Sequence, residues 1–272
     1  MSGISLIPTA GDHLQGSWST HLDVPSPCDV ELSGRSVVHQ PHRSPGDSVE
    51  QLDALAELIL GPAEQADWLA LPASTRRRRQ WLFGRLAAKD AVRQLLPDAR
   101  GRALHPREVK ILKGRRGGPE ATVEDPSVGG PHILVSIAHI DHVAVAIACA
   151  DRRAQGIGID VERFRTDRVI ERFGLSESER RSLDGLAARA RADHVARMWC
   201  AKEAVSKALG TGLFPLGGPS ALTVERLDEW GARLRVHVAE SPEYGARWFE
   251  AATARNGDVV LATAVARCRG DE

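Results

Sequence analysis

The chain has 272 residues, of which 42% are hydrophobic and 26% are charged, and these values are ordinary for a globular protein with one large or two small domains. Its 36 Lys and Arg balance its 36 Asp and Glu, so the net charge by itself excludes no class of partner. We see no apolar run long enough to span a membrane, and the N-terminus lacks the pattern of a secretory signal. With four cysteines that have no metal-type spacing, these features predict a protein of the reducing cytoplasm.

The first stretch of the chain, residues 1–49, is rich in Pro, Ser, Gly and His and shows little periodicity. Such a composition predicts an extended or partly disordered N-terminal segment. We expect at most one short strand in it, near Val37.

A long helix is predicted from the N-cap residue Ser74 to Leu96, after helical patterns at residues 48–60 and from Pro62 onward. Four basic residues fall near one face of this long helix: Arg78, Arg85, Lys89 and Arg93. They belong to a basic block, residues 76–116, with 14 Lys and Arg against 3 Asp and Glu. The block favours an anionic ligand, or an acidic protein partner attracted to this face, although it is also compatible with a solvated surface. Binding of nucleic acid is a third possibility, but the block has neither interleaved aromatic residues nor a reader motif, so we expect no nucleic-acid partner.

Strands are predicted at residues 105–111, 132–139 and 143–148, and a buried strand follows at Gly156–Glu162. Because side chains alternate along a strand, Asp160 and Glu162 project from the same face of it. The next distinctive segment, Trp199–Leu209, reads as a helix that ends at a glycine, and it places Glu203 and Lys207 one turn apart.

Strand and helix together would assemble three carboxylates and two ammonium groups: Asp160, Glu162, Glu203, Lys202 and Lys207. Carboxylate oxygens of this kind suit Mg²⁺, which binds a few carboxylates together with phosphates and water. The lysines could neutralise phosphate charge that the metal does not reach. The alternative is structural: Glu203 and Lys207 form a helix salt bridge, and the strand carboxylates end at a solvated edge.

An internal repeat indicates how the chain is organised. Residues 88–96 match residues 201–209 without a gap, with Lys89 aligned to Lys202 and Asp90 to Glu203. Apolar strand patterns also follow each helix. We therefore predict an α+β protein of two similar halves, residues 50–150 and residues 151–272.

One further carboxylate, Glu179, lies in a Ser-x-x-Glu pattern that is typical of a capping box at the start of a helix. This pattern supplies a structural interpretation of the residue. A catalytic role of Glu179 is the alternative to this structural interpretation.

The segments Gly158-Ile-Asp-Val-Glu162 and Trp199-x-x-Lys-Glu-Ala-x-x-Lys207 resemble the paired signature of the 4′-phosphopantetheinyl transferases of the larger, Sfp-like type. The resemblance covers residues 54–267. It implies an intramolecular pseudo-dimer, active as a monomer, with the active site between its halves. It also implies transfer of phosphopantetheine from coenzyme A to a serine of an apo acyl or peptidyl carrier protein of fatty-acid, polyketide or peptide synthesis.

The resemblance also implies roles for individual residues. Magnesium ligands would be Asp160, Glu162 and Glu203. Coenzyme A contacts would be Arg78, Arg85, Lys89, Ser136, His139, Lys202 and Lys207. The last two lysines and Glu203 would act in catalysis, with Glu179 as the base that accepts the serine proton; Glu177 and a water molecule on the metal are the alternatives.

A different functional class stays open, namely a catalytically weak coenzyme A or carrier-protein interaction domain of an assembly line. The presence of Asp160, Glu162, Glu203 and Lys207 together argues against it, because a binding module does not need all four.

Overall fold

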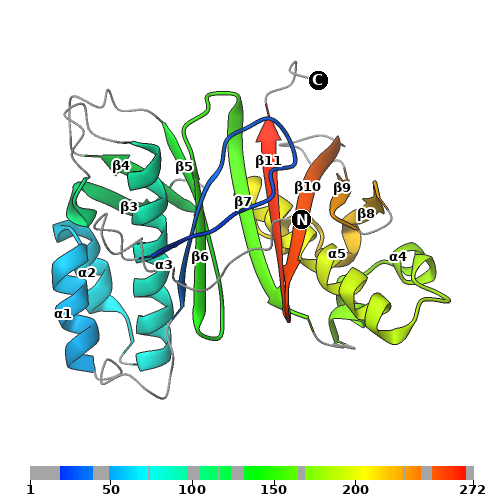
Figure 1. The fold of residues 1–272 in the computed structure, drawn as a ribbon, viewed down its shortest axis with the longest axis horizontal. Helices are drawn as coiled ribbons and strands as arrows, with labels where there is room; N and C mark the ends of the chain where they lie inside the picture. Colours follow the sequence, from blue (N-terminus) through cyan, green and yellow to red (C-terminus); the bar gives the residue numbers. More distant parts are fainter. Residues whose placement is uncertain are drawn as a thin grey trace.

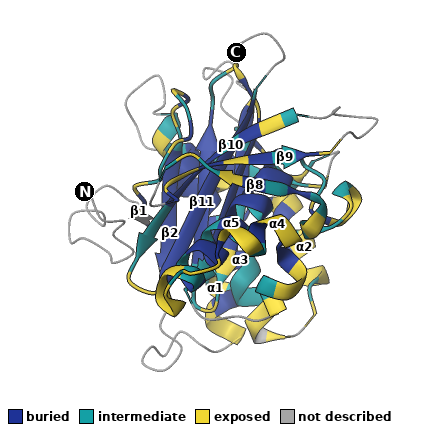
Figure 2. Cartoon of the chain, turned by 90° about the vertical axis from the view of Figure 1, so that its right-hand side faces the viewer, coloured by how far each residue is buried: buried dark blue, intermediate teal, exposed yellow. Residues whose placement is uncertain are grey.

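The computed structural model describes residues 19–38, 49–72, 74–96, 104–114, 117–123, 132–164, 169–228, 231–239 and 247–267. Two antiparallel sheets lie face to face at the centre of these residues, and the helices cover the outer faces (Figure 1). The strands are dark blue, that is buried, over most of their length, whereas exposed residues concentrate on the helices and turns (Figure 2). The observed class is α+β, as the sequence predicted.

The first sheet has the strand order β1-β2-β6-β5-β4-β3. Its strands are β1 (Thr20–His21), β2 (Ser33–Val38), β3 (Val109–Lys113), β4 (Pro119–Val123), β5 (Ile133–Ile140) and β6 (Val143–Cys149). The long helix α3 (Thr75–Leu95) packs on this sheet through buried residues such as Leu82 and Leu86. Helices α1 (Val49–Ile59) and α2 (Pro62–Ala70) and the 3₁₀ helix η3 (Pro106–Glu108) complete this layer.

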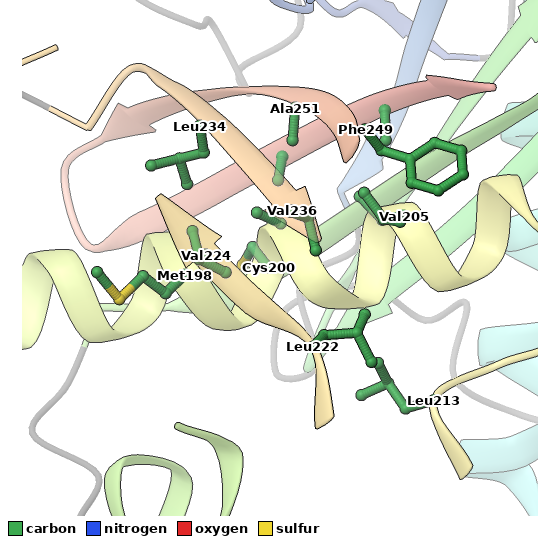
Figure 3. Packing of buried hydrophobic residues seen from close by; sticks show 14 of the residues in the cluster. Met198, Cys200, Val205, Leu213, Leu222, Val224, Leu234, Val236, Phe249 and Ala251 are labelled. Carbon is green, nitrogen blue, oxygen red and sulfur yellow. The ribbon is translucent and has the colours of Figure 1, made fainter. Parts of the chain in front are cut away.

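The second sheet has the strand order β7-β11-β10-β9-β8. Its strands are β7 (Ala154–Arg163), β8 (Thr223–Arg226), β9 (Arg233–Val238), β10 (Arg247–Asn256) and β11 (Val259–Arg267). Helix α5 (Ala188–Ala208) crosses its outer face, where Met198 and Val205 meet apolar residues of β8, β9 and β10 (Figure 3). Shorter elements surround α5: η5 (Ile170–Gly174), α4 (Glu177–Ser182), η6 (Phe214–Leu216) and η7 (Pro219–Ala221).

A third core lies between the two sheets and comes from the alternation of side chains along β7. Ile157, Ile159 and Val161 point toward the first sheet, whereas Gly156, Gly158 and Asp160 point toward α5. The apolar residues between the sheets hold the two halves together, because burial of such side chains stabilises by about 2 kcal/mol each.

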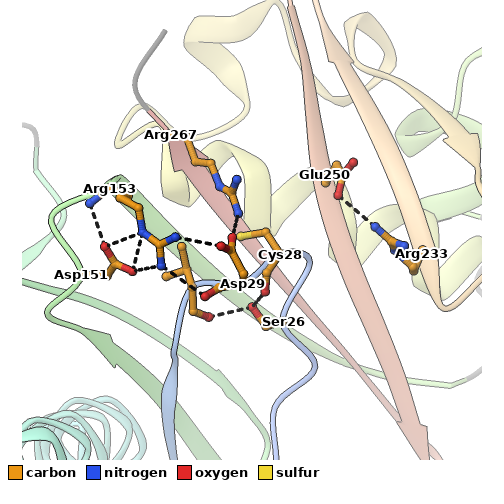
Figure 4. A network of polar contacts seen from close by, with 9 residues as sticks. Ser26, Cys28, Asp29, Asp151, Arg153, Arg233, Glu250 and Arg267 are labelled. Atoms are coloured by element: carbon orange, nitrogen blue, oxygen red, sulfur yellow. Dashed lines mark hydrogen bonds and ion pairs between the residues drawn. The ribbon is translucent and has the colours of Figure 1, made fainter. Parts of the chain in front are cut away.

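The N-terminal segment is more ordered than the sequence suggested. Strand β2 pairs with β6 along its whole length, and Leu22 and Val30 are buried between the sheets. Asp29 accepts hydrogen bonds from Arg153 at 2.7 Å and from Arg267, so the segment, which pairs with β6 of the first half, also contacts the second half (Figure 4). The expected boundary at residue 49 is therefore corrected: residues 19–38 belong to the packed fold, and the rest of the expected segment, residues 1–18 and 39–48, lies outside the described residues.

The strand order β2-β6-β5-β4-β3 of the first half is the same as the order β7-β11-β10-β9-β8 of the second. In each half the long helix, α3 or α5, packs against the sheet. The change of sheet falls between β6 and β7, close to the predicted division at residue 150. In the part of the chain that the structure describes, no helix is both long and apolar enough to cross a membrane.

Candidate active site

Helix α5 lies directly on β7 because two glycines leave room for its backbone. A Cβ atom on Gly158 would lie 1.8 Å from the carbonyl oxygen of Ala204, and one on Gly156 would lie 1.9 Å from that of Ala208. Only glycine permits so close an approach of helix to strand. The Gly-x-Gly-x-Asp pattern of β7 thus brings Asp160 against the second half of α5.

At this contact Lys207 Nζ donates to Asp160 Oδ1 at 2.8 Å and to the carbonyl oxygen of Ile159 at 3.0 Å. Asp160 is 8% exposed, and its second carboxylate oxygen, Oδ2, is buried without a hydrogen-bond partner among the described residues. The thiol of Cys200 also interacts with this carboxylate, but a thiol is a weak donor, so the buried oxygen is available to a stronger ligand.

Glu203 interacts electrostatically with Asp160 and Glu162, and these three residues are called the carboxylate cluster below. Burial raises the pKa of Glu203 above its ordinary value, and the negative charge of Asp160 raises it further. The ammonium group of Lys207 opposes this effect, while Glu162 adds to it. The structure therefore brings Asp160, Glu162, Glu203 and Lys207 within electrostatic reach of one another.

Three neighbouring carboxylates and an unpaired carboxylate oxygen fit a divalent cation bound through oxygen, such as Mg²⁺. No group of three His, Cys, Asp or Glu side chains in the described ranges is already close enough to form a metal site. A cation here would therefore take part of its coordination from phosphate oxygens and water.

A cavity of about 330 Å³ lies between α3 and the turn that joins β5 to β6. It is lined by Arg76, Arg79, Gln80, Asp141 and His142. Asp141 has a positive φ of 44°, which makes this turn tight. Arg163, the residue after Glu162, donates to Asp141 at 2.5 Å and thereby joins the cavity wall to the end of β7.

His139 is within electrostatic reach of Arg76 of this cavity and of Asp160 and Lys207. Burial of the ring is the main cause that lowers the pKa of His139, and the positive charge of Lys207 lowers it further. Asp160 opposes the shift, and Arg76 adds to it. The imidazole thus lies in a positive environment that a phosphate group would neutralise.

Lys89 does not have the exposure that a coenzyme A contact needs. It is fully buried, and its ammonium group donates to Glu64 at 2.6 Å and to the carbonyl oxygens of Pro106 and Val109. All three of its donor hydrogens are therefore used inside the protein. The predicted role is corrected to a structural one.

The same correction applies to Lys202 and Glu179. Lys202 is fully buried and donates to Glu179 at 2.7 Å and to the carbonyl oxygens of Gly174 and Pro219. Glu179 accepts from the backbone N–H groups of Ser176 and Val224 as well. A carboxylate held in this way is badly placed to take a proton from a substrate, and the alternative base, Glu177, is exposed and paired with Arg181.

Ser136 is also buried, and its hydroxyl accepts a hydrogen bond from the N–H of Ile159, which ties the first sheet to β7. This bond joins the two sheets, and the predicted contact of Ser136 with coenzyme A stays a prediction. Arg78 and Arg85 stack on Trp68 and Trp81, on the face of α3 that meets α1 and α2. Their predicted contacts with coenzyme A stay predictions.

The residues that sequence reasoning missed are Arg76, Arg79 and His142 of the smaller cavity. The arginine run at the start of α3 was recognised, but the face that meets the cavity is shifted from the predicted one. A larger cavity of about 760 Å³ lies between α4 and β8. None of Asp160, Glu162, Glu203 and Lys207 lines it, so we place the candidate site at the smaller cavity and the carboxylate cluster.

Comparison with known proteins adds an independent observation. The family model of the 4′-phosphopantetheinyl transferase superfamily matches residues 156–264. The holo-[acyl-carrier-protein] synthase of Chlorobaculum tepidum is 33% identical over 101 residues, which cover 37% of this chain and 82% of that protein.

Two solved structures show a more distant likeness. A holo-(acyl-carrier-protein) synthase of Bacillus anthracis, in complex with CoA (3′,5′-ADP), is 24% identical and covers 41% of this chain and 95% of its own, with a TM-score of 0.32. The holo-[acyl-carrier-protein] synthase of Thermotoga maritima is 25% identical and covers 53% of this chain and 74% of its own, with a TM-score of 0.35.

Proposed function

This chain belongs to the 4′-phosphopantetheinyl transferase superfamily and is a phosphopantetheinyl transferase, and we propose that it transfers the 4′-phosphopantetheine group of coenzyme A to a serine of an apo acyl or peptidyl carrier protein, with release of 3′,5′-ADP. The observation that carries the proposal is the Asp160–Lys207 pair at 2.8 Å, because Asp160 keeps one buried oxygen unpaired and interacts electrostatically with Glu203, as Glu162 does. Such a site can hold a cation and a pyrophosphate together.

Asp160, Glu162 and Glu203 would hold Mg²⁺ in this proposal. When bound, the ion supplies positive charge that stabilises a phosphoryl group during transfer. The buried unpaired oxygen of Asp160 supports this assignment, because it is the kind of acceptor that a hard cation satisfies.

The cationic side chains would hold the rest of coenzyme A. Lys207 is bonded to Asp160 and would neutralise pyrophosphate charge, while His139 is within electrostatic reach of Lys207, Asp160 and Arg76. Arg76 and Arg79 would bind a further phosphate group in the adjacent cavity. The hydroxyl of the carrier serine would then form the new P–O bond while the bond from phosphorus to 3′,5′-ADP breaks, and the serine proton would pass to a water molecule.

The proposal includes an architecture and a setting. The shared strand order of the halves supports an intramolecular pseudo-dimer whose active site lies between them, since α3 and the β5–β6 turn come from one half and β7 and α5 from the other. We propose that the chain acts as a monomer in the cytoplasm. The pathway that supplies its carrier protein is left open.

Intact-mass spectrometry tests the reaction itself. An apo carrier protein incubated with this protein, coenzyme A and Mg²⁺ is expected to gain the mass of one phosphopantetheine group, and EDTA is expected to prevent the gain. The same carrier with its acceptor serine replaced by alanine is the control. Bound coenzyme A without any mass gain, over carriers of several types, would favour the interaction-domain alternative.

The smaller cavity leads to a separate prediction about the affinity for coenzyme A. Arg79→Ala and Arg76→Ala are each expected to raise KM for coenzyme A about tenfold with little change in kcat, because each removes a charged contact to a non-reacting phosphate. Arg77→Ala is the matched control, since Arg77 is exposed on the same turn and does not line the cavity. A rise in KM for Arg85→Ala with no rise for Arg79→Ala would restore the contacts predicted from the sequence.

A further inference from the structure

The two halves share a buried Glu–Lys cluster that the reaction does not use. In the first half Glu64 accepts from Lys89 at 2.6 Å, and in the second half Glu179 accepts from Lys202 at 2.7 Å. All four side chains are at most 2% exposed. A buried ion pair in each half, with its lysine at an aligned position of the internal repeat, indicates a common structural role.

The agreement extends to single atoms. Each glutamate is the third residue of a short helix, and its Oε2 accepts from the N-cap backbone N–H of Gly61 or Ser176; in the second half the hydroxyl of Ser176 also accepts from Glu179 N–H and completes a capping box. Each Oε1 accepts from the edge strand of its sheet, Ile111 N–H at 3.2 Å or Val224 N–H at 2.6 Å.

Each lysine also donates to the carbonyl oxygen of the proline that opens a 3₁₀ helix. Lys89 contacts Pro106 at 3.0 Å, and Lys202 contacts Pro219 at 2.8 Å. In each half one ammonium group thus fixes the long helix to a short helix, a 3₁₀ helix and, through the glutamate, an edge strand.

The two Glu–Lys clusters differ in the contacts of the residue that follows the lysine in the long helix. Glu203, which follows Lys202, joins the carboxylate cluster at Asp160. Asp90, which follows Lys89, is bonded instead by Ser19 at 2.8 Å and by Arg93 at 2.5 Å. The first half therefore has the buried Glu–Lys cluster but no counterpart of the carboxylate cluster at Asp160.

Helix α5 is held on two sides around Glu203. Gly158 of β7 meets the carbonyl oxygen of Ala204 on one side, and Lys202 bonds η5, η7 and α4 on another. A small shift of α5 would change the distance between Glu203 and Asp160, and metal sites depend on such support from residues that do not touch the metal.

We infer that Lys202, through Glu179, is a positioning residue that sets Glu203 against Asp160 for cation binding, whereas its counterpart Lys89 serves stability alone. The inference rests on the proposed function in one respect, that the carboxylates bind a divalent cation. It assigns Lys202 no contact with coenzyme A.

The test compares Lys202→Met with Lys89→Met in the full chain. Removing one partner of a buried pair destabilises strongly, so both variants are expected to lower the melting temperature to a similar extent. Binding of Mn²⁺, followed by electron paramagnetic resonance without coenzyme A or carrier protein, is expected to weaken about tenfold in Lys202→Met and to stay within about twofold in Lys89→Met.

A second pair of variants tests the same inference if the single lysine variants fold poorly. Glu179→Gln/Lys202→Met and Glu64→Gln/Lys89→Met remove both charges, and each is expected to regain part of the lost melting temperature, because no lone buried charge remains. The weakened Mn²⁺ binding is expected to persist only in the pair with Lys202.

Two results would overturn the inference. One is a Lys202→Met protein with an unchanged melting temperature and a selective loss of coenzyme A affinity, since this is the behaviour of a phosphate contact. The other is equal Mn²⁺ affinity in the two lysine variants. By contrast, a wild-type protein that binds Mn²⁺ but transfers nothing would contradict the proposed function and leave the inference standing.

Discussion

Replacing Asp160 by asparagine is expected to lower kcat/KM for phosphopantetheine transfer about a thousandfold, the size of effect that several kcal/mol of metal-ion stabilisation implies. Asp160 has two tasks, because Oδ1 holds Lys207 at 2.8 Å and the buried Oδ2 is the acceptor offered to the cation. Asparagine keeps the shape but replaces one oxygen by a donor group, which repels both a cation and the lysine. Steady-state kinetics with coenzyme A and a carrier protein, together with Mn²⁺ binding, would measure both losses.

The control for this variant is Glu225→Gln, which removes a carboxylate from the exposed edge strand β8. Its kinetics and Mn²⁺ affinity are expected to match those of the wild-type protein. An Asp160→Asn protein with wild-type Mn²⁺ affinity would show that the metal lies elsewhere, and one with near wild-type turnover would remove Asp160 from the reaction.

Replacing Gly158 by alanine is expected to lower the free energy of unfolding by about 3 kcal/mol or more, the upper part of the range for overpacked cores. The added Cβ would lie 1.8 Å from the carbonyl oxygen of Ala204, and neither atom belongs to a side chain that can rotate away. Helix and strand must separate, and Glu203 then moves away from Asp160. Denaturant unfolding measures the stability, and Mn²⁺ binding of the remaining folded protein measures the site.

The matched control is Gly118→Ala, because a Cβ at this position meets nothing within 4 Å and its φ is not in the left-handed region. A change of less than about 0.5 kcal/mol is expected there. If Gly158→Ala were as stable as Gly118→Ala, the close packing of α5 on β7 would not be the feature that supports the site.

Much of the candidate site was predictable because it depends on local geometry. Alternation along a strand places Asp160 and Glu162 on one face, and helical spacing places Glu203 one turn from Lys207. The apolar residues around Asp160 predicted a buried strand. These are short-range regularities, and the structure joins the strand and the helix as expected, with Lys207 bonded to Asp160.

The roles of three other residues depended on packing that the sequence does not express locally. Lys89, Lys202 and Glu179 read as candidates for phosphate and proton chemistry, yet all three are buried in structural clusters. The internal repeat favours a structural role for Lys202, because this lysine recurs as Lys89 in the first half, whereas Lys207 aligns with Gln94. A residue repeated where the chemistry is not repeated is more consistent with structure than with catalysis.

The sequence by itself determined the class of the fold, the two halves and the carboxylates of the site, since hydrophobic period, repeat and residue spacing are properties of neighbouring residues. Only the tertiary structure decided which arginines of α3 meet a cavity and which lysines are buried. The environment of each face of α3 depends on the elements packed around it. Arg78 stacks on Trp68 of α2 and Arg85 on Trp81 of α3 itself, whereas a cavity lies between the β5–β6 turn and Arg76 and Arg79. The order of the N-terminal segment also depends on tertiary packing, because Leu22 and Val30 become core residues only where the two sheets meet around them.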